Sequence, residues 1–231
     1  SDVCSSDLAH NLHEPPSRSL APVEAGGAVG VSSRTVGDIA LAIQQSEPGS
    51  RRVVLMGRAR DVGTTLTAIA LARSLAETGR VVLVDLSLAS PNIDVISSDP
   101  TAPGIADMVR GIASFGDIIT KDRFSRVHLV AAGAVGHDAE GLMNSQMLSA
   151  AVGALAQSYD YLVIDSGAHS RSTVAPLAAM AAHAVLVGGD VAESALTPLV
   201  RELKSAGFAT VTSLIGPPPV SDPVVAQTSA A

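Results

Sequence analysis

The stretch that decides the fold of this chain runs from residue 52 to residue 65. It reads Arg52-Val53-Val54-Leu55-Met56-Gly57, then Arg58-Ala59-Arg60-Asp61-Val62-Gly63-Thr64-Thr65, and an alanine-rich segment follows. The first part is a short apolar run typical of a buried strand, and the segment after Thr65 has helical periodicity. A strand, a glycine-containing turn and a helix that opens on two threonines predict a loop whose backbone N–H groups can surround phosphates.

This loop matches the phosphate-binding P-loop pattern G-x-x-x-x-G-K-[ST] only in part. Gly63 and Thr65 occupy the positions of the second glycine and of the hydroxyl that holds Mg²⁺. Thr64 stands where the pattern has the lysine that reaches the β- and γ-phosphates, and Arg58 stands where it has the first glycine. We therefore expect binding of ATP and Mg²⁺ to be weak or lost. The candidate nucleotide-binding residues are Gly63, Thr64, Thr65, Arg58 and Arg60.

The composition favours one α/β domain and excludes several classes of protein. The 231 residues are 47% apolar and 16% charged, which is enough for one domain with a full core. Aromatic residues make up only 2%, so Val, Leu, Ile and Ala must fill that core, as in a parallel sheet covered by alanine-rich helices. The net charge of −7 argues against broad nucleic-acid binding. No run approaches the ~18 apolar residues of a membrane span.

The chain divides into four segments. Residues 1–8 resemble a translated sequencing adaptor, and we interpret them as a non-native scar. They contain Cys4, the single cysteine, so the remaining chain cannot form a disulfide. Residues 9–33 are rich in Pro, Gly, Ala and Ser and are predicted to be a disordered linker. Residues 34–216 form the predicted domain, and residues 217–231, which begin with three prolines, are predicted to be a flexible tail. We expect the chain to be a fragment of a longer protein.

Strands and helices alternate along the predicted domain. Short apolar runs that each lead into a helical segment imply a mostly parallel sheet with both faces covered, which is a three-layer α/β sandwich. The predicted strands are Arg52–Gly57, Val81–Asp85, Arg126–Ala131, Tyr161–Asp165, Ala184–Val187 and Ala209–Ile215. The predicted helices are Ser33–Ser46 with Ser33 as N-cap, Thr64–Thr78, Gly104–Arg110 with Phe115–Thr120, Ala139–Ser158, Thr173–Ala182 and Glu193–Ala206.

Two of the predicted strands end in a carboxylate, at Asp85 and Asp165. Ligands of parallel sheets bind beyond the carboxyl ends of the strands, and an aspartate there can hold Mg²⁺ or its waters beside a P-loop. If a nucleotide binds, the metal ligands are Thr65, Asp85 and Asp165, and the two aspartates are the candidate catalytic residues. As plain strand ends they would be structural caps. His169 follows in the next loop, either as a base or as an incidental histidine.

At these residues the chain resembles the cytoplasmic ATPase domain of the bacterial tyrosine kinases that partner polysaccharide chain-length determinants, the polysaccharide co-polymerases. That family is related to the MinD/ParA-like P-loop ATPases. The resemblance runs from about residue 34 to residue 215. Asp85, Leu88 and Pro91 match a strand end of the family, and the segments 103–109, 127–133 and 159–165 resemble three more of its motifs.

Each departure from the family pattern replaces or removes a residue that the family uses for nucleotide binding or phosphoryl transfer. The loop lysine is Thr64, a loop glycine is Asp61, and the second aspartate of a D-x-D strand end is Ser87. The tyrosine-rich tail of the family is absent, because Tyr159 and Tyr161 are the only tyrosines and flank an interior strand.

The resemblance therefore implies a catalytically degenerate member that regulates exopolysaccharide or lipopolysaccharide chain length or export. Its implied partners are the membrane region of the co-polymerase or the export machinery, with a possible homo-oligomer and no nucleic acid. Its implied location is the cytoplasm at the inner membrane, within a longer membrane-anchored protein.

Two alternatives stay open at this stage. An active ATP-dependent tyrosine kinase could use Arg58 or Arg60 in place of the lysine, because arginine binds phosphate well. Alternatively, both arginines are solvated charges of the loop, with Arg60 paired to Asp61. A MinD/ParA-like positioning ATPase is the other alternative, although the signature lysine of that group would fall at Ala59.

Overall fold

The computed structural model describes residues 31–33 and 35–217 of the chain. The predicted scar at 1–8, most of the predicted linker and residues 218–231 of the predicted tail therefore lie outside the described residues. Three residues assigned to the linker, Val31–Ser33, instead form a strand that pairs in parallel with Thr210–Ile215. That part of the domain boundary was wrong, because a partner strand supplies the pairing that the local composition does not predict.

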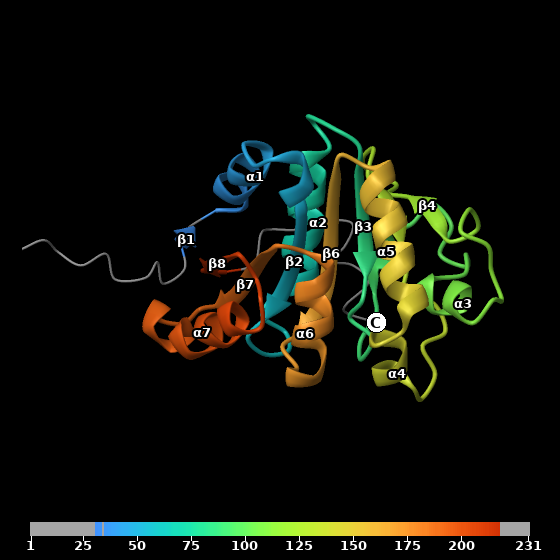
Figure 1. Cartoon of the computed structure of the whole chain (residues 1–231). Helices are drawn as coiled ribbons and strands as arrows, with labels where there is room; N and C mark the ends of the chain where they lie inside the picture. Colours follow the sequence, from blue (N-terminus) through green and yellow to red (C-terminus); the bar gives the residue numbers. More distant parts are fainter. Residues whose placement is uncertain (1–30, 34, 218–231) are drawn as a thin grey trace, which may run out of the picture.

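The centre of the fold is an eight-stranded sheet with the order β1-β8-β7-β2-β6-β3-β5-β4 (Figure 1). Every neighbouring pair is parallel except β4 and β5, which are antiparallel. The strands are β1 Val31–Ser33, β2 Arg52–Gly57, β3 Val81–Asp85, β4 Ile119–Lys121, β5 His128–Val130, β6 Tyr161–Ala168, β7 His183–Gly189 and β8 Thr210–Ile215. The mostly parallel sheet predicted from the sequence is confirmed.

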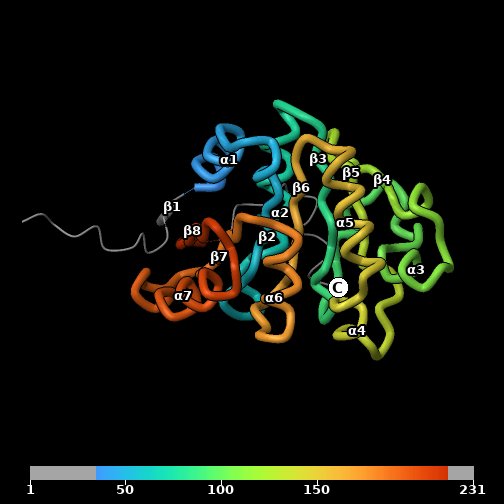
Figure 2. Tube along the Cα trace, viewed as in Figure 1, coloured from blue at the N-terminus to red at the C-terminus, as the bar shows by residue number. Residues whose placement is uncertain are grey.

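Helices cover both faces of this sheet. They are α1 Val36–Gln44, α2 Thr64–Leu75, α3 Ile105–Val109, α4 Ala139–Met143, α5 Gln146–Ser158, α6 Arg171–Met180 and α7 Thr197–Ser205, with 3₁₀ helices η1 Pro48–Ser50, η2 Ile93–Ile96 and η3 Glu193–Leu196. Figures 1 and 2 show α5, α6 and α7 in front of the sheet and α2 behind it. The predicted three-layer sandwich is therefore confirmed.

The side chains of β2 alternate between two hydrophobic cores. Val54 and Met56 pack with the layer of α5, α6 and α7, whereas Val53 and Leu55 pack with the layer of α1 and α2. All four are buried, since neighbouring side chains of a strand point to opposite faces of a sheet that is covered on both sides. This double burial explains the continuous apolar run that leads into the loop at residues 58–63.

The predicted helix Phe115–Thr120 was wrong. The carboxylate of Asp117 accepts hydrogen bonds from the backbone N–H of Ser114 at 2.9 Å and from its hydroxyl at 2.6 Å, and this closes a turn. Such side-chain bonds compete with the helix for the backbone N–H groups. The chain then enters β4, where Ile119 pairs with Val130 on the edge of the sheet.

The predicted helix Ala139–Ser158 is two helices. The chain breaks after Met143, and the hydroxyl of Ser145 caps the second helix by accepting from the N–H of Met147 at 3.2 Å. Met143 at the end of α4 is buried, whereas Met147 in the first turn of α5 is 56% exposed. The two methionines, four residues apart, therefore do not lie on one helix face. At the amino end, Thr35 rather than Ser33 caps α1, with its hydroxyl accepting from the N–H of Asp38.

Candidate functional site

The loop between β2 and α2 lies at the carboxyl edge of the sheet, between the ends of β6 and β7. The N–H of Arg58 donates to the carbonyl of Val187 on β7 at 2.9 Å, and the N–H of His169 donates to the carbonyl of Gly57 at 2.7 Å. These two bonds attach the first residues of the loop to both neighbouring strands. The loop is therefore positioned as the sequence predicted, at the place where parallel sheets bind ligands.

Gly57 supplies the close approach that the sequence assigned to the position of Arg58. A Cβ atom on Gly57 would lie 2.3 Å from the hydroxyl of Thr64 and 2.8 Å from the carbonyl of Ala59. Because the second of these atoms is backbone, only glycine fits without moving the loop. Sequence reasoning missed this residue, although a glycine that ends an apolar strand directly before the loop was the signal for it.

Two residues in the left-handed region shape the rest of the loop. Gly63 has φ 84° and is the N-cap residue of α2, and Asp61 has φ 59°. A positive φ is uncommon outside glycine, but aspartate is among the residues that adopt it most readily. The loop thus keeps its curvature at the position where the resembled family has a glycine, and a carboxylate is added there.

Thr64 is buried, and it occupies the first position of α2 with its hydroxyl facing Gly57. A threonine is too short and carries no charge, so it cannot make the lysine contact with the β- and γ-phosphates. Arg58 is directed away from that role, since its Nε donates to the carbonyl of Gly188 at 2.9 Å. Arg60 is exposed, and among the described residues no ion pair joins it to Asp61.

Thr65, in the first turn of α2, and Asp165, near the carboxyl end of β6, form a direct contact. The hydroxyl of Thr65 donates to Oδ2 of Asp165 at 2.6 Å, and the N–H of Gly167 donates to Oδ1 at 2.9 Å. Asp165 is fully buried, and this burial, with a smaller contribution from the charge of Asp85, raises its pKa to about 6. A hydroxyl beside a carboxylate is the donor set that P-loop proteins use for Mg²⁺, so these two residues fit the ion.

Asp85 is also buried at a strand end, but its own loop takes both carboxylate oxygens. Oδ1 accepts from the N–H of Ser87 at 2.9 Å and from its hydroxyl at 2.6 Å, and Oδ2 accepts from the N–H groups of Asn92 and Ile93 at 3.2 and 3.3 Å. Burial raises the pKa of Asp85 against the opposing effect of these bonds. Asp85 and Asp165 are register partners on β3 and β6, so the structure brings the two predicted carboxylates together.

His169 lies beside the loop, but its ring has another neighbour. Its Nε2 is 3.3 Å from Oε1 of Glu202 on α7 and makes no hydrogen bond in the structure. Nothing in this arrangement favours its use as a base over an incidental position. Within residues 31–33 and 35–217, no group of three or more His, Cys, Asp or Glu side chains is arranged for a metal ion. None of the described helices is long and apolar enough to cross a membrane.

The comparisons with known proteins place this geometry among P-loop proteins. No protein-family model and no curated protein sequence matches the chain. Among solved structures it is similar to the VpsO kinase domain, with a TM-score of 0.69 and 21% identity over 79% of this chain and 92% of that chain. It is also similar to the kinase domain of the Escherichia coli tyrosine kinase ETK, with a TM-score of 0.70 and 16% identity over 80% of this chain and 74% of that chain.

A third solved structure in this group is an ATPase. The septum site-determining protein MinD from Pyrococcus horikoshii, complexed with Mg-ADP, has a TM-score of 0.59 and 24% identity over 71% of this chain and 69% of that chain. All three proteins share the MinD/ParA-like P-loop NTPase fold, and the chain has this fold. At these identities the likeness establishes the fold alone, so the activity has to be argued from the site.

Proposed function

We propose that this chain is a catalytically degenerate P-loop domain of a polysaccharide co-polymerase. In this proposal it regulates the chain length or export of exopolysaccharide or lipopolysaccharide by binding other proteins. It is the cytoplasmic part of a longer protein anchored in the inner membrane. The similarity in fold to the VpsO and ETK kinase domains supports the choice of family.

The observation that carries the proposal is Thr64 at the first position of α2. Each charge-assisted hydrogen bond of the missing lysine would be worth about 1.5–3 kcal/mol, so its loss weakens nucleotide binding roughly ten- to a hundredfold. The same charge stabilises the transferred phosphoryl group in the transition state, so turnover falls further. Asp61 adds a negative charge to the loop, which opposes an approaching phosphate.

The second strand-end carboxylate gives further support. Both carboxylate oxygens of Asp85 accept hydrogen bonds from the segment from Ser87 to Ile93. A metal or water contact would have to replace those bonds. The contact between Thr65 and Asp165 remains, and these residues would hold Mg²⁺ if a nucleotide binds. The ion would neutralise phosphate charge there. Such a domain keeps its shape and some nucleotide affinity while losing catalysis.

The test is turnover of ATP and Mg²⁺ by the purified domain, together with equilibrium binding of ATP. We expect no turnover above background for the native chain. Thr64→Lys is expected to bind ATP about ten- to a hundredfold more tightly, since it restores the charge. Thr64→Met is the matched control, because it adds a long side chain without a charge and should leave affinity low. ATP hydrolysis by the native chain that Asp165→Ala abolishes would contradict the proposal.

An active kinase that uses an arginine is a second candidate, favoured only by the exposed position of Arg60 in the loop. It predicts that Arg60→Ala lowers the affinity for ATP sharply. Arg58→Ala should do so less, since the guanidinium of Arg58 already bonds to Gly188. A positioning ATPase is the third candidate, because the fold is also that of MinD. The sequence that precedes this segment in its gene would separate it from a co-polymerase, which has two membrane spans around a periplasmic region.

A further inference from the structure

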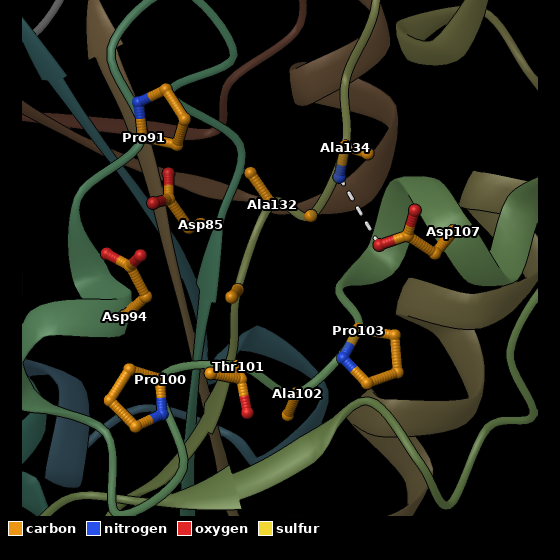
Figure 3. Close-up of a pocket in the computed structure, with 12 residues that line it drawn as sticks. Asp85, Pro91, Asp94, Pro100, Thr101, Ala102, Pro103, Asp107, Ala132 and Ala134 are labelled. Carbon is orange, nitrogen blue, oxygen red and sulfur yellow. Dashed lines mark hydrogen bonds between the residues drawn. The ribbon is translucent and has the colours of Figure 1, made fainter.

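A cavity of about 370 Å³ lies at the carboxyl ends of β3 and β5, on the side of β6 away from the nucleotide loop. Figure 3 shows it between the segment that follows β3 and the segment that follows β5. Ligand cavities of proteins range from about 300 to 1,000 Å³, so this one lies near the lower end of that range. Asp85 is the one candidate residue of the nucleotide site that lines it.

Hydrogen bonds fix the wall of the cavity that follows β5. The carboxylate of Asp107 accepts from the N–H of Gly104 at 2.9 Å and from the N–H of Ala134 at 3.3 Å. The guanidinium of Arg110 donates to the carbonyls of Ala134 and Val135. A wall held by this many bonds is preorganised, and a ligand that enters need not order it.

The cavity is lined by acidic, proline and small residues. Asp85, Asp94 and Asp107 contribute the only charged side chains of the lining. Asp85 and Asp107 already accept hydrogen bonds from the chain itself, whereas Asp94 is exposed and no described residue hydrogen-bonds to its carboxylate. Asp94 is therefore the one charged group of the lining with both oxygens available to a ligand.

Three proline rings provide the apolar surface of the cavity, at Pro91, Pro100 and Pro103. An alkyl stem can pack on such rings while a cationic group at its end pairs with Asp94. Arginine suits this site better than lysine, since its planar guanidinium is weakly hydrated and can bind a carboxylate bidentately. An acidic ligand would be repelled by the carboxylates of the lining.

We propose that this cavity is a docking site for an arginine side chain of a basic protein partner. A second copy of the chain is the poorer source, because the chain carries a net charge of −7 and two copies repel each other. This docking site rests on the proposed function, in which the domain acts by binding other proteins, and it would form one contact between the domain and its partner.

The probe for this site is the tripeptide acetyl-Gly-Arg-Gly-amide, titrated into the ¹⁵N-labelled chain and followed by NMR. Chemical-shift changes are expected at the amides of Thr101, Ala102, Ala132 and Ala134, and they should weaken as salt is raised. The matched probe replaces arginine with citrulline, which keeps the shape and loses the charge. Equal binding of both peptides, or shifts spread over the whole surface, would overturn the proposal.

Two variants assign the contact to one carboxylate. Asp94→Asn is expected to weaken binding of the arginine peptide about two- to fivefold, the effect of one exposed charge pair. Asp190→Asn removes an equal charge from the exposed end of β7, outside the lining, and should leave the affinity unchanged. An equal loss of affinity in both variants would mean that the peptide responds only to the net charge of the chain, and this would contradict the proposal. Self-association blocked by Asp94→Asn would instead identify a second copy as the occupant.

This experiment is independent of the test of the proposed function, because it uses neither ATP nor Mg²⁺. ATP turnover by a chain that still binds the arginine peptide would remove the degenerate-domain proposal and leave the docking site. A chain that shows no ATP turnover and also fails to bind the peptide would leave the degenerate-domain proposal and remove the docking site.

Discussion

The ends of β6 and β3 each carry an aspartate at paired positions of the sheet, yet the two carboxylates have different hydrogen-bond partners. Asp165 on β6 accepts a hydrogen bond from the hydroxyl of Thr65 at the start of α2, so it links the sheet to the helix that follows the loop at residues 58–63. Asp85 on β3 accepts all of its hydrogen bonds from Ser87, Asn92 and Ile93 of its own loop. The end of β6 therefore contacts the start of α2, whereas the end of β3 holds the segment from Ser87 to Ile93 beside the cavity.

The difference shows that a strand-end aspartate does not report its role by itself. The role depends on which N–H and O–H groups reach the carboxylate, and these come from segments distant in sequence for Asp165 but adjacent for Asp85. Ser87 strengthens the second arrangement, because its hydroxyl donates to Asp85 at 2.6 Å. An aspartate at that position would repel Asp85 instead.

The largest expected effect is a difference in stability between variants of the two aspartates. Asp85→Ala should cost roughly 3–5 kcal/mol of unfolding free energy, because it leaves several buried donors without an acceptor. Asp165→Ala should cost about 1–2 kcal/mol, since only Thr65 and Gly167 lose their acceptor. Urea unfolding measures both, with the exposed Asp190→Ala as control. An equal loss of unfolding free energy in Asp85→Ala and Asp165→Ala would show that the two carboxylates contribute alike to stability.

The next effect is the pH dependence of stability through Asp165. Its pKa of about 6 lies above the ordinary 3.8, so the folded state holds this proton more tightly than the unfolded state. The stability that the proton provides is present below about pH 4 and is lost as the pH rises to about 6, in total about 3 kcal/mol. Relative to the native chain, Asp165→Asn should therefore gain stability between pH 4 and pH 7, measured by urea unfolding.

Asp160→Asn provides the control of opposite sign. The N–H of Arg80 donates to the carboxylate of Asp160 and lowers its pKa, so its contribution to stability is present at neutral pH and is lost on acidification. This variant should lose stability relative to the native chain as the pH rises toward about 4, and the difference should then stay constant between pH 4 and pH 7. A flat difference for Asp165→Asn over the same range would show that Asp165 is not buried as described.

The smallest expected effect tests the link between the loop helix and β6. Thr65→Val keeps the shape of the side chain and removes the donor to Asp165, which should cost about 1 kcal/mol of stability. Because this hydrogen bond lowers the pKa of Asp165, its loss should raise that pKa above about 6. Carbon-13 NMR of the Asp165 carboxyl group measures the change. Thr67→Val, whose hydroxyl bonds to Gly63, is the control that should leave the titration in place.

Much of the fold was predictable because its signals are local. The apolar run of β2, the glycine turn and the helix that starts at Thr64 are fixed by residues adjacent in sequence. The errors occurred where a contact decides between local alternatives. The turn from Ser114 to Asp117 replaced a predicted helix, and strand β1 formed only because β8 offers an edge.

The candidate site was predictable in position but not in detail. Residue order placed Thr65, Asp85 and Asp165 at the carboxyl edge of the sheet, and the structure brings them there. Sequence spacing could not show that Gly57 meets the hydroxyl of Thr64, or that Arg58 bonds to Gly188. Those contacts depend on the fold of the loop against β7, which no local pattern encodes.

The sequence by itself determined the architecture and the threonine at position 64 of the loop, because strand periodicity and the identity of residue 64 are properties of the chain alone. Tertiary structure decided the partners of each carboxylate and the cavity beside β3. Hydrogen bonds and enclosed volume arise only when segments far apart in sequence pack together. The sequence therefore shows which residues the site contains, and the structure shows what those residues contact.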